Sequence, residues 1–401
     1  MMIRNLFLFL SLFLCGESFV LAQAVDGDSQ AKPLILAHYM PWFSASPRAD
    51  DSGEMSWGWH WTMNHFDPDQ VKGDRRQIAS HFYPVIGPYD SADPAVLEYH
   101  LLLMKTAGID GVIVDWYGLE AFNDYPMLHR NTQLLFEAVS KRGMKFAICY
   151  EDQTIPIMVR AGRLNESDQV SHAINEINQM QTMWFDHPCY VRVDGKPVLL
   201  SFGDSGLTND GWKECLAGLK HSVAYFSEHT RRDGAMGAYD WPVPSMGFKA
   251  SDRFETLAKS WEYAIPVAFP RFVDCYAEGN AGDGYQHIDD WGGETFKRTL
   301  VTASKFNAPM IQLATWNDWG EGTQIEPSRE HGFRDLEMIQ MFRRRYVDKK
   351  FAAKADDLQL PLELWKQRQD AAADDGRLTE VADLIADGEF ARARKRLESR
   401  R

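Results

Sequence analysis

Short apolar runs rich in β-branched and aromatic residues alternate with longer amphipathic segments along most of the chain. This alternation is typical of repeated strand–helix units around a parallel sheet. The runs predict strands at residues 34–40, 109–117, 144–152, 197–204, 221–226, 234–242, 266–272 and 309–316. The pairing of the two middle runs stays open. About eight strands in a region near the ~250-residue norm predict an α/β fold, a (β/α)8 TIM barrel.

Amphipathic stretches of helical length separate most of these runs. The segments 94–108 and 131–143 both end on glycine, which is a frequent helix stop. Further helices are expected at 168–185, 252–263 and 294–306, and a hairpin-like turn at 191–196. The long segment 43–82 is expected to form a loop after the first strand, with a short helix or two.

The N-terminus has the features of a secretory signal. Arg4 precedes the apolar run LFLFLSLFL, and Ala22-Gln23-Ala24 supplies the small residues that a signal peptidase reads. The run is shorter than the ~20 residues that a membrane span needs. We therefore expect a signal peptide at 1–24, cleavage after Ala24, and a secreted or periplasmic protein. A lipoprotein anchor at Cys15 is the alternative.

The amino-acid composition of the remaining chain changes near residue 345. We expect the (β/α)8 catalytic barrel at 25–345, because the predicted strands and helices fill this region. The segment 346–401 is charged and Ala-rich with two breaks, which predicts a small helical C-terminal appendage. No later stretch has the pattern of a transmembrane segment, so no membrane contact is expected after signal cleavage.

Charge and aromatic content narrow the class of partner. The formal net charge of −14 argues against nucleic acids and anionic membranes, both of which bind basic surfaces. The chain has 13 Trp, 14 Tyr and 23 Phe, and its tryptophans cluster with polar residues in loop-like segments. Sugar rings stack their apolar face on such side chains, although half of these aromatics could belong to the core. We expect a carbohydrate substrate and a monomeric protein.

No cofactor motif stands out. The sequence contains no P-loop, GxGxxG or HExxH motif, and its twelve histidines are not at metal-ligand spacing, so we expect no metal and no cofactor. Four cysteines remain after cleavage and allow three disulfide connectivities, but a chain of this length buries a core without them, so no bridge is expected. Gly203-Asp204-Ser205-Gly206 matches the surroundings of a serine-protease nucleophile, but it lacks the upstream histidine motif.

Acidic and aromatic residues recur directly after the predicted strands. In a (β/α)8 barrel the active site lies at the carboxyl ends of the strands. A single Asp after a strand is usually a helix cap, but five such strand ends make that explanation insufficient for the set. The substrate-binding candidates at these ends are His38, Tyr39, Trp42, Asp115, Trp116, Tyr117, Glu151, Asp240, Trp241, Trp316, Asn317 and Trp319.

Asp318 and Glu321 form the best pair of catalytic carboxyl groups. Glycosidic cleavage needs one carboxyl to protonate the leaving oxygen and one to act as base or nucleophile. Gly320 and Gly322 flank Glu321 and allow a sharp turn, so both side chains could face one cavity. Neighbouring tryptophans and a second carboxylate would raise the pKa of the acid. In the alternative interpretation one of the two caps a helix or pairs with Arg329.

The segment TWNDWGEGTQIEP resembles the last barrel strand of glycoside hydrolase family 99, the endo-α-mannosidases and endo-α-mannanases. It is also similar to family 71, the α-1,3-glucanases. HYMPWF, GIDGVIVDWYG and DGKPVLLSF support the same grouping, which covers most of residues 34–330. The resemblance implies that Glu321 is the general acid/base. Asp318 stands where family 99 has a glutamate that contacts the sugar 2-hydroxyl, and is one methylene shorter, as in family 71.

The segment WGWHW resembles the aromatic loop near the sugar site of family 99. The resemblance implies that Trp59, His60 and Trp61 line sugar subsites, whereas a hydrophobic plug over the barrel is the alternative. The expected protein is an exported glycoside hydrolase that cleaves α-glycosidic bonds of an α-mannan or α-glucan by carboxylate acid/base catalysis. A non-catalytic glycan-binding barrel is the alternative.

Overall fold

The computed structural model describes residues 32–47, 55–370 and 376–399. A parallel sheet runs through it in the strand order β12-β11-β10-β9-β7-β6-β1-β14-β13. Its strands are β1 Leu34–Tyr39, β6 Gly111–Trp116, β7 Lys145–Tyr150, β9 Lys196–Ser201, β10 Ala224–Glu228, β11 Gly237–Tyr239, β12 Tyr263–Ile265, β13 Val267–Ala268 and β14 Met310–Leu313. A short strand β8, Arg192–Val193, pairs antiparallel with β9 and forms the expected hairpin.

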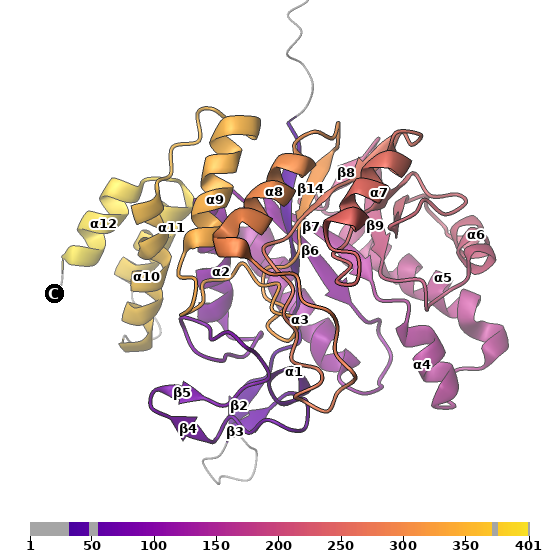
Figure 1. Ribbon diagram of the computed structural model, residues 1–401, viewed down its shortest axis with the longest axis horizontal. Helices are drawn as coiled ribbons and strands as arrows, with labels where there is room; N and C mark the ends of the chain where they lie inside the picture. The colour runs from indigo at the N-terminus through magenta and orange to yellow at the C-terminus, as the bar shows by residue number, and fades with distance from the viewer. Residues whose placement is uncertain (1–31, 48–54, 371–375, 400–401) are drawn as a thin grey trace, which may run out of the picture. The chain divides into compact units, whose positions relative to one another are not determined.

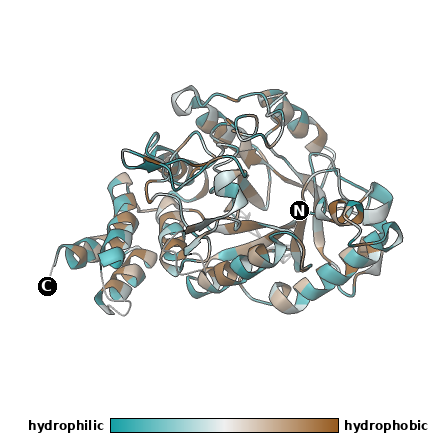
Figure 2. Cartoon of the chain, turned by 90° about the horizontal axis from the view of Figure 1, so that it is seen from below, coloured by the Kyte–Doolittle hydropathy of each residue, from teal (hydrophilic) through white to brown (hydrophobic). Residues whose placement is uncertain are grey.

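The two ends of this sheet belong to one stretch of chain, which closes it. β12 pairs with β11, β13 pairs with β14, and only Pro266 separates β12 from β13. Proline has no N–H and interrupts the ladder, while its carbonyl still accepts from the backbone N–H of Gln312 at 3.0 Å. Counted as one position, β12 and β13 make eight parallel positions, so the predicted (β/α)8 barrel is confirmed. Figure 2 shows the hydrophobic strands encircled by helices with hydrophilic outer faces.

Successive side chains of each strand point alternately into the barrel and toward the helices. On β6, Val112, Val114 and Trp116 pack in the outer layer with the helices, whereas Ile113 packs inside. Asp115 shares the inward direction of Ile113. By the same alternation His38 of β1 and Cys149 of β7 face inward. The polar side chains at the ends of these strands therefore lie together in the interior of the barrel.

Helices cover the outside of the barrel. They are α2 Pro94–Ala107, α3 Tyr125–Lys141, α4 Thr154–Arg160, α5 Gln169–Met180, α6 Asn209–Gly218, α7 Phe248–Ala258, α8 Glu294–Ala303 and α9 Arg334–Phe342. Short 3-10 and π turns lie at Glu166–Asp168, Gln181–Phe185, Trp291–Gly293, Arg343–Val347 and Ala355–Leu358. The side chain of Asp93 caps α2, and Gly108 ends it at φ 86°, in the left-handed region that favours glycine. The sequence pattern did not reveal α4 and α6.

The segment after β1 is more structured than the expected loop. It holds one short helix, α1 Trp59–Thr62, and two hairpins, β2 Ala45–Pro47 with β3 Met55–Trp57, and β4 Val71–Lys72 with β5 Arg75–Arg76. Figure 1 shows α1 and both hairpins together at the end of the barrel toward which β1 runs. The strand expected at 266–272 also differs, because the ladder begins at Tyr263 and Phe272 instead forms an antiparallel bridge with Ile288.

The C-terminal segment forms three helices, α10 Gln359–Asp370, α11 Gly376–Ala386 and α12 Phe390–Glu398. Their apolar residues bury one another together with Leu102 of α2. Glu98 of α2 also pairs with Arg368 of α10, with 2.5 Å between guanidinium Nε and carboxylate. The expected signal peptide lies outside the described residues. Within the described part, every helix is too short or too polar to cross a membrane.

Candidate active site

A cavity of about 260 Å³ opens at the carboxyl ends of the barrel strands, the position expected for a (β/α)8 enzyme. Four carboxyl groups and several aromatic rings line it. Its lining residues are Met40, Trp42, Asp115, Tyr117, Tyr125, Glu151, Gln153, Thr154, Ile157, Phe202, Trp241, Tyr276, Asp318 and Glu321. No lysine or arginine is among these described lining residues, so the cavity has an acidic character.

The loop after β14 carries Asp318 and Glu321. The Asp318 carboxylate accepts from the backbone N–H of Glu321 at 3.0 Å, and the Asp318 N–H donates to the hydroxyl of Thr315 at 2.8 Å. Gly322 has φ 67°, and a Cβ there would lie 2.5 Å from the carbonyl oxygen of Val273. The turn therefore needs glycine at 322. Both carboxyl groups face the same cavity, as the sequence predicted.

A buried polar network fixes the far end of this loop. The Glu326 carboxylate accepts from the Tyr89 hydroxyl at 2.7 Å and from Trp319 Nε1 at 3.1 Å. Its other oxygen lies 3.1 Å from Nε2 of His100, whose Nδ1 is 2.9 Å from the Tyr39 hydroxyl. Both the His100 and Glu326 side chains are fully buried. The network ties the acid-bearing loop to α2 and β1.

Asp318 and Glu321 differ in how readily they ionise. Burial raises the pKa of Asp318 to about 7, while backbone N–H groups of Glu321 and Gly320 oppose the rise. Burial, followed by the negative charge of Asp318, raises the pKa of Glu321 well above its usual range. The Tyr276 hydroxyl opposes this rise by donating to Glu321 Oε1 at 3.4 Å. The charge of Asp318 therefore favours the proton on Glu321, which makes Glu321 the better candidate for the acid of the pair.

Asp115 and Glu151 form a second pair of carboxyl groups on the cavity wall, at the ends of β6 and β7. Burial and the charge of Asp318 raise the pKa of Asp115 to about 8, and a hydrogen bond with Glu151 opposes the rise. Burial, then the charge of Asp115, raises the pKa of Glu151 as well. Gln153 Nε2 donates to Glu151 Oε1 at 2.6 Å. Burial and the mutual repulsion of the two groups therefore both favour a proton on this pair.

A second cavity of about 220 Å³ adjoins the first. The two share Trp42, Tyr117, Tyr276 and Asp318, and the second adds Trp59, His60, Met63 and Gly320. His60 stacks on Trp42 with 4.1 Å between ring centroids and 8° between planes. Trp59 keeps 39% of its surface exposed. Aromatic faces therefore extend from the acidic cavity toward the surface.

The structure brings together nine of the seventeen expected site residues on the walls of these cavities. They are Trp42, Trp59, His60, Asp115, Tyr117, Glu151, Trp241, Asp318 and Glu321. Arg329, the alternative partner for a catalytic carboxylate, instead pairs with Asp74 at 2.5 Å.

The other eight expected residues lie behind the cavity walls, which corrects the expectation of direct lining. They are His38, Tyr39, Trp61, Trp116, Asp240, Trp316, Asn317 and Trp319, and all are buried. Tyr39, Trp116 and Trp316 pack in the layer between strands and helices. Tyr39 and Trp116 do so because side chains alternate along a strand. Asn317 bonds both backbone groups of Met40, and the Trp61 indole donates to the carbonyl of Tyr89 at 2.8 Å.

Several lining residues were not among the expected ones. Tyr276 lies in the long loop after β13, well beyond the strand end at Ala268, so inspection of the strand ends does not find it. Gln153, Thr154 and Ile157 come from the start of α4, a helix that the pattern did not reveal. Tyr125 starts α3.

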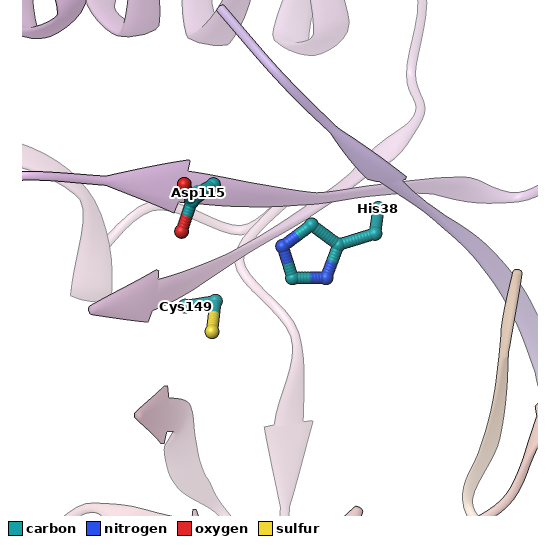
Figure 3. Close-up of side chains that lie close together, drawn as sticks. All are labelled: His38, Asp115 and Cys149. Carbon is teal, nitrogen blue, oxygen red and sulfur yellow. The ribbon is translucent and has the colours of Figure 1, made fainter. Parts of the chain in front are cut away.

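One group of side chains has the donor atoms of a metal site. His38, Asp115 and Cys149 offer a nitrogen, an oxygen and a sulfur that all lie within 4.8 Å of one another (Figure 3). Burial lowers the pKa of His38 to about 3, so its imidazole is neutral. Cys149, Cys189, Cys215 and Cys275 are all buried and unbridged. Spacing along the sequence could not reveal this group, because each member comes from a different strand.

Known proteins resemble this chain over most of its length. A glycoprotein endo-alpha-1,2-mannosidase-like protein of Danio rerio is 24% identical over 327 residues, 73% of this chain and 70% of that protein. The glycoprotein endo-alpha-1,2-mannosidase of Rattus norvegicus is 23% identical over 329 residues, 73% of this chain and 67% of that protein.

A solved structure shares the fold. The GH99 endo-alpha-mannosidase of Bacteroides thetaiotaomicron, in complex with BIS-TRIS-propane, aligns with a TM-score of 0.58 at 19% identity. The alignment covers 78% of this chain and 98% of that chain. The likeness supports the barrel architecture.

The family model "Glycosyl hydrolase family 99" matches residues 32–234, half of the chain. The matched region contains the barrel strands β1, β6, β7, β9 and β10, and with them Asp115 and Glu151. Asp318 and Glu321 follow it in the sequence. The resemblance to family 99 is thereby confirmed, and that to family 71 stays a prediction. Together with the barrel and its acid-lined cavity, this match shows that the chain belongs to glycosyl hydrolase family 99 and is a glycoside hydrolase.

Proposed function

We propose that this glycoside hydrolase cleaves α-mannosidic bonds within glycans, with Glu321 as general acid/base and Asp318 as its partner. One observation carries the assignment: both carboxyl groups extend from one loop into one buried cavity, where their environments separate their pKa values. A site that cleaves a glycosidic bond needs such a pair, one protonated and one ionised.

Glu321 donates its proton to the glycosidic oxygen as the bond to the leaving sugar breaks. The Asp318 carboxylate, held by the backbone N–H of Glu321, takes a proton from the attacking oxygen, which is either a water molecule or the sugar 2-hydroxyl. If water attacks, cleavage is complete in this step, and both carboxyl groups recover their starting protonation by exchange with solvent. If the 2-hydroxyl attacks, it forms a 1,2-epoxide; Glu321 then takes a proton from the water that opens this ring, and Asp318 returns its proton to the 2-oxygen. Tyr276 orients the Glu321 carboxyl through their hydrogen bond.

The shape and charge of the site favour a neutral oligosaccharide. The acidic cavity disfavours anionic sugars, and the rings of Trp42 and Trp241 offer faces for sugar stacking. The adjoining cavity gives room for sugars on both sides of Asp318, which supports cleavage within a chain. The relatives named endo-alpha-1,2-mannosidase support an α-mannosyl substrate over an α-glucan. We propose export as well, on the sequence of residues 1–24.

The test compares wild type, Glu321→Gln and Asp318→Asn on α-mannans, α-glucans and an aryl α-mannobioside with an acidic leaving group. We expect wild type to release mannose oligosaccharides from α-mannan, and both variants to lose at least about a hundredfold, the size of one acid/base contribution. The aryl substrate needs no protonation, so Glu321→Gln should retain its initial bond cleavage far better than Asp318→Asn does.

Glu294→Gln serves as the control, because Glu294 is an exposed carboxylate at the start of α8, outside both cavities. The assignment of the acids fails if either variant keeps the wild-type rate on α-mannan. Release from α-glucan alone would replace the proposed substrate. Calorimetric binding of oligosaccharide without any product would favour the glycan-binding alternative.

A further inference from the structure

His38, Asp115 and Cys149 stand on three neighbouring strands, β1, β6 and β7, and face the barrel interior. Figure 3 shows the imidazole edge turned toward the space between the carboxylate and the thiol. The three donor atoms lie within 4.8 Å of one another, and the side chains are at most 3% exposed. Parallel pairing brings these positions together, because β1 pairs with β6 and β6 with β7.

Two atoms of this group have no partner within the described chain. His38 Nε2 and Asp115 Oδ1 are both fully buried and make no hydrogen bond. A buried polar atom is costly unless something binds it, and native proteins contain few of them. Both atoms therefore point to an occupant between these side chains.

The surrounding residues hold the donors as metal ligands are usually held. Nδ1 of His38 lies 3.5 Å from the side-chain oxygen of Gln312, which can accept the Nδ1 proton and leave the Nε2 lone pair free. The sulfur of Cys149 lies 3.7 Å from the hydroxyl of Tyr239, which can donate to a thiolate. A second set of contacts thus orients both the nitrogen and the sulfur donor.

We propose that His38, Asp115 and Cys149 bind one Zn²⁺ ion beneath the acidic cavity. Imidazole nitrogen, carboxylate oxygen and thiolate sulfur are its usual ligands, and three of them leave the fourth tetrahedral position open. One carboxylate and one thiolate balance its charge, and binding releases the protons of the Cys149 thiol and the Asp115 carboxyl to solvent. Asp115 also lines the acidic cavity, so the proposed site adjoins it. The inference goes beyond the proposed cleavage and does not depend on it.

The experiment uses the full chain, stripped with a chelator and titrated with Zn²⁺ and, separately, with Co²⁺. We expect one equivalent of either metal, and for Co²⁺ the intense visible bands of a tetrahedral site together with a sulfur-to-metal charge-transfer band in the near ultraviolet. Cys149→Ser should abolish the charge-transfer band, and His38→Ala should weaken binding at least about tenfold. Cys215→Ser is the matched control, since Cys215 is buried on α6 outside the group.

Circular dichroism establishes that each variant is folded, and Asp115→Asn adds a nearly isosteric change that tests the oxygen ligand. Absence of a bound equivalent in folded wild type overturns the proposal. A charge-transfer band that survives Cys149→Ser but disappears in Cys215→Ser also overturns it. Cleavage of α-mannan by protein that binds no metal would refute the zinc site and leave the proposed function standing.

Discussion

The buried carboxylate of Glu326 should contribute strongly to stability, although it lies outside both cavities. Glu326→Ala removes the acceptor of three buried donors: His100 Nε2, the Tyr89 hydroxyl and Trp319 Nε1. Trp319 Nε1 still donates to the Tyr89 hydroxyl oxygen at 3.3 Å, so two donors lose their only acceptor. Each unsatisfied buried donor costs ~1–3 kcal/mol, which gives a range of about 2–6 kcal/mol. Water can enter the space left by the side chain and satisfy some of them. We therefore expect a loss of about 4 kcal/mol, a large part of the ~5–15 kcal/mol typical of a domain.

Glu326→Gln is the matched control. Its amide oxygen can accept from Tyr89 and Trp319, and its NH2 group can donate to Nε2 of His100 if the imidazole proton moves to Nδ1. That rearrangement leaves the Tyr39 hydroxyl without its acceptor, so we expect a loss of only about 1 kcal/mol.

Urea unfolding at pH 7, followed by tryptophan fluorescence, measures both variants, provided that the m-value stays constant. Steady-state kinetics on α-mannan should show a lower kcat for Glu326→Ala, because the network anchors the loop of Asp318 and Glu321. If the free energy of unfolding of Glu326→Ala lies within about 1 kcal/mol of wild type, the buried contacts of Glu326 do not stabilise the fold.

Three further predictions concern other parts of the molecule. Burial raises the pKa of Glu176 to about 7, so the free energy of unfolding should be highest below pH ~4.5, where Glu176 is protonated in both states, and should fall by up to about 3 kcal/mol as pH rises to ~7. Glu176→Gln should flatten the pH dependence of the urea midpoint, and an unchanged slope would contradict this reasoning. Gly111→Ala should give insoluble protein, since its Cβ would lie 2.1 Å from the Lys145 carbonyl oxygen, whereas Gly376→Ala meets nothing within 4 Å and should fold normally. Trp59→Ala should lower kcat/KM on long oligosaccharides about tenfold and leave aryl mannosides unaffected; equal losses on both would argue against a distal subsite.

The barrel could be predicted from the sequence because the patterns that indicate its strands and helices are local. Each strand is a short apolar run, and a rule for the whole fold places the active site at the carboxyl ends. Asp115, Glu151 and Asp318 could therefore be assigned to one site without coordinates. The middle strands were identified but not paired; the structure pairs β10 with both β9 and β11 in parallel.

The pattern of hydrophobic and polar residues did not predict the direction of individual side chains or the contacts between distant parts of the chain. Tyr39 and Trp116 flank inward-facing residues, but one step along a strand turns a side chain to the other face, so both point away from the cavity. The His100–Glu326 contact joins residues 226 positions apart, and nothing in either local sequence indicates the other. Tyr276 depends on the path of a long loop, which short-range preferences do not determine.

The burial of Leu102 among the C-terminal helices has a consequence for how this enzyme can be divided. Leu102 belongs to a barrel helix, yet its neighbours include Leu360, Leu364 and Leu378 of α10 and α11. A chain that ended after α9 would expose this apolar face of α2 and leave Glu98 without Arg368. Residues 32–399 should therefore be inherited, exchanged or fused as one unit, with the three helices acting as a permanent cover for one side of the barrel.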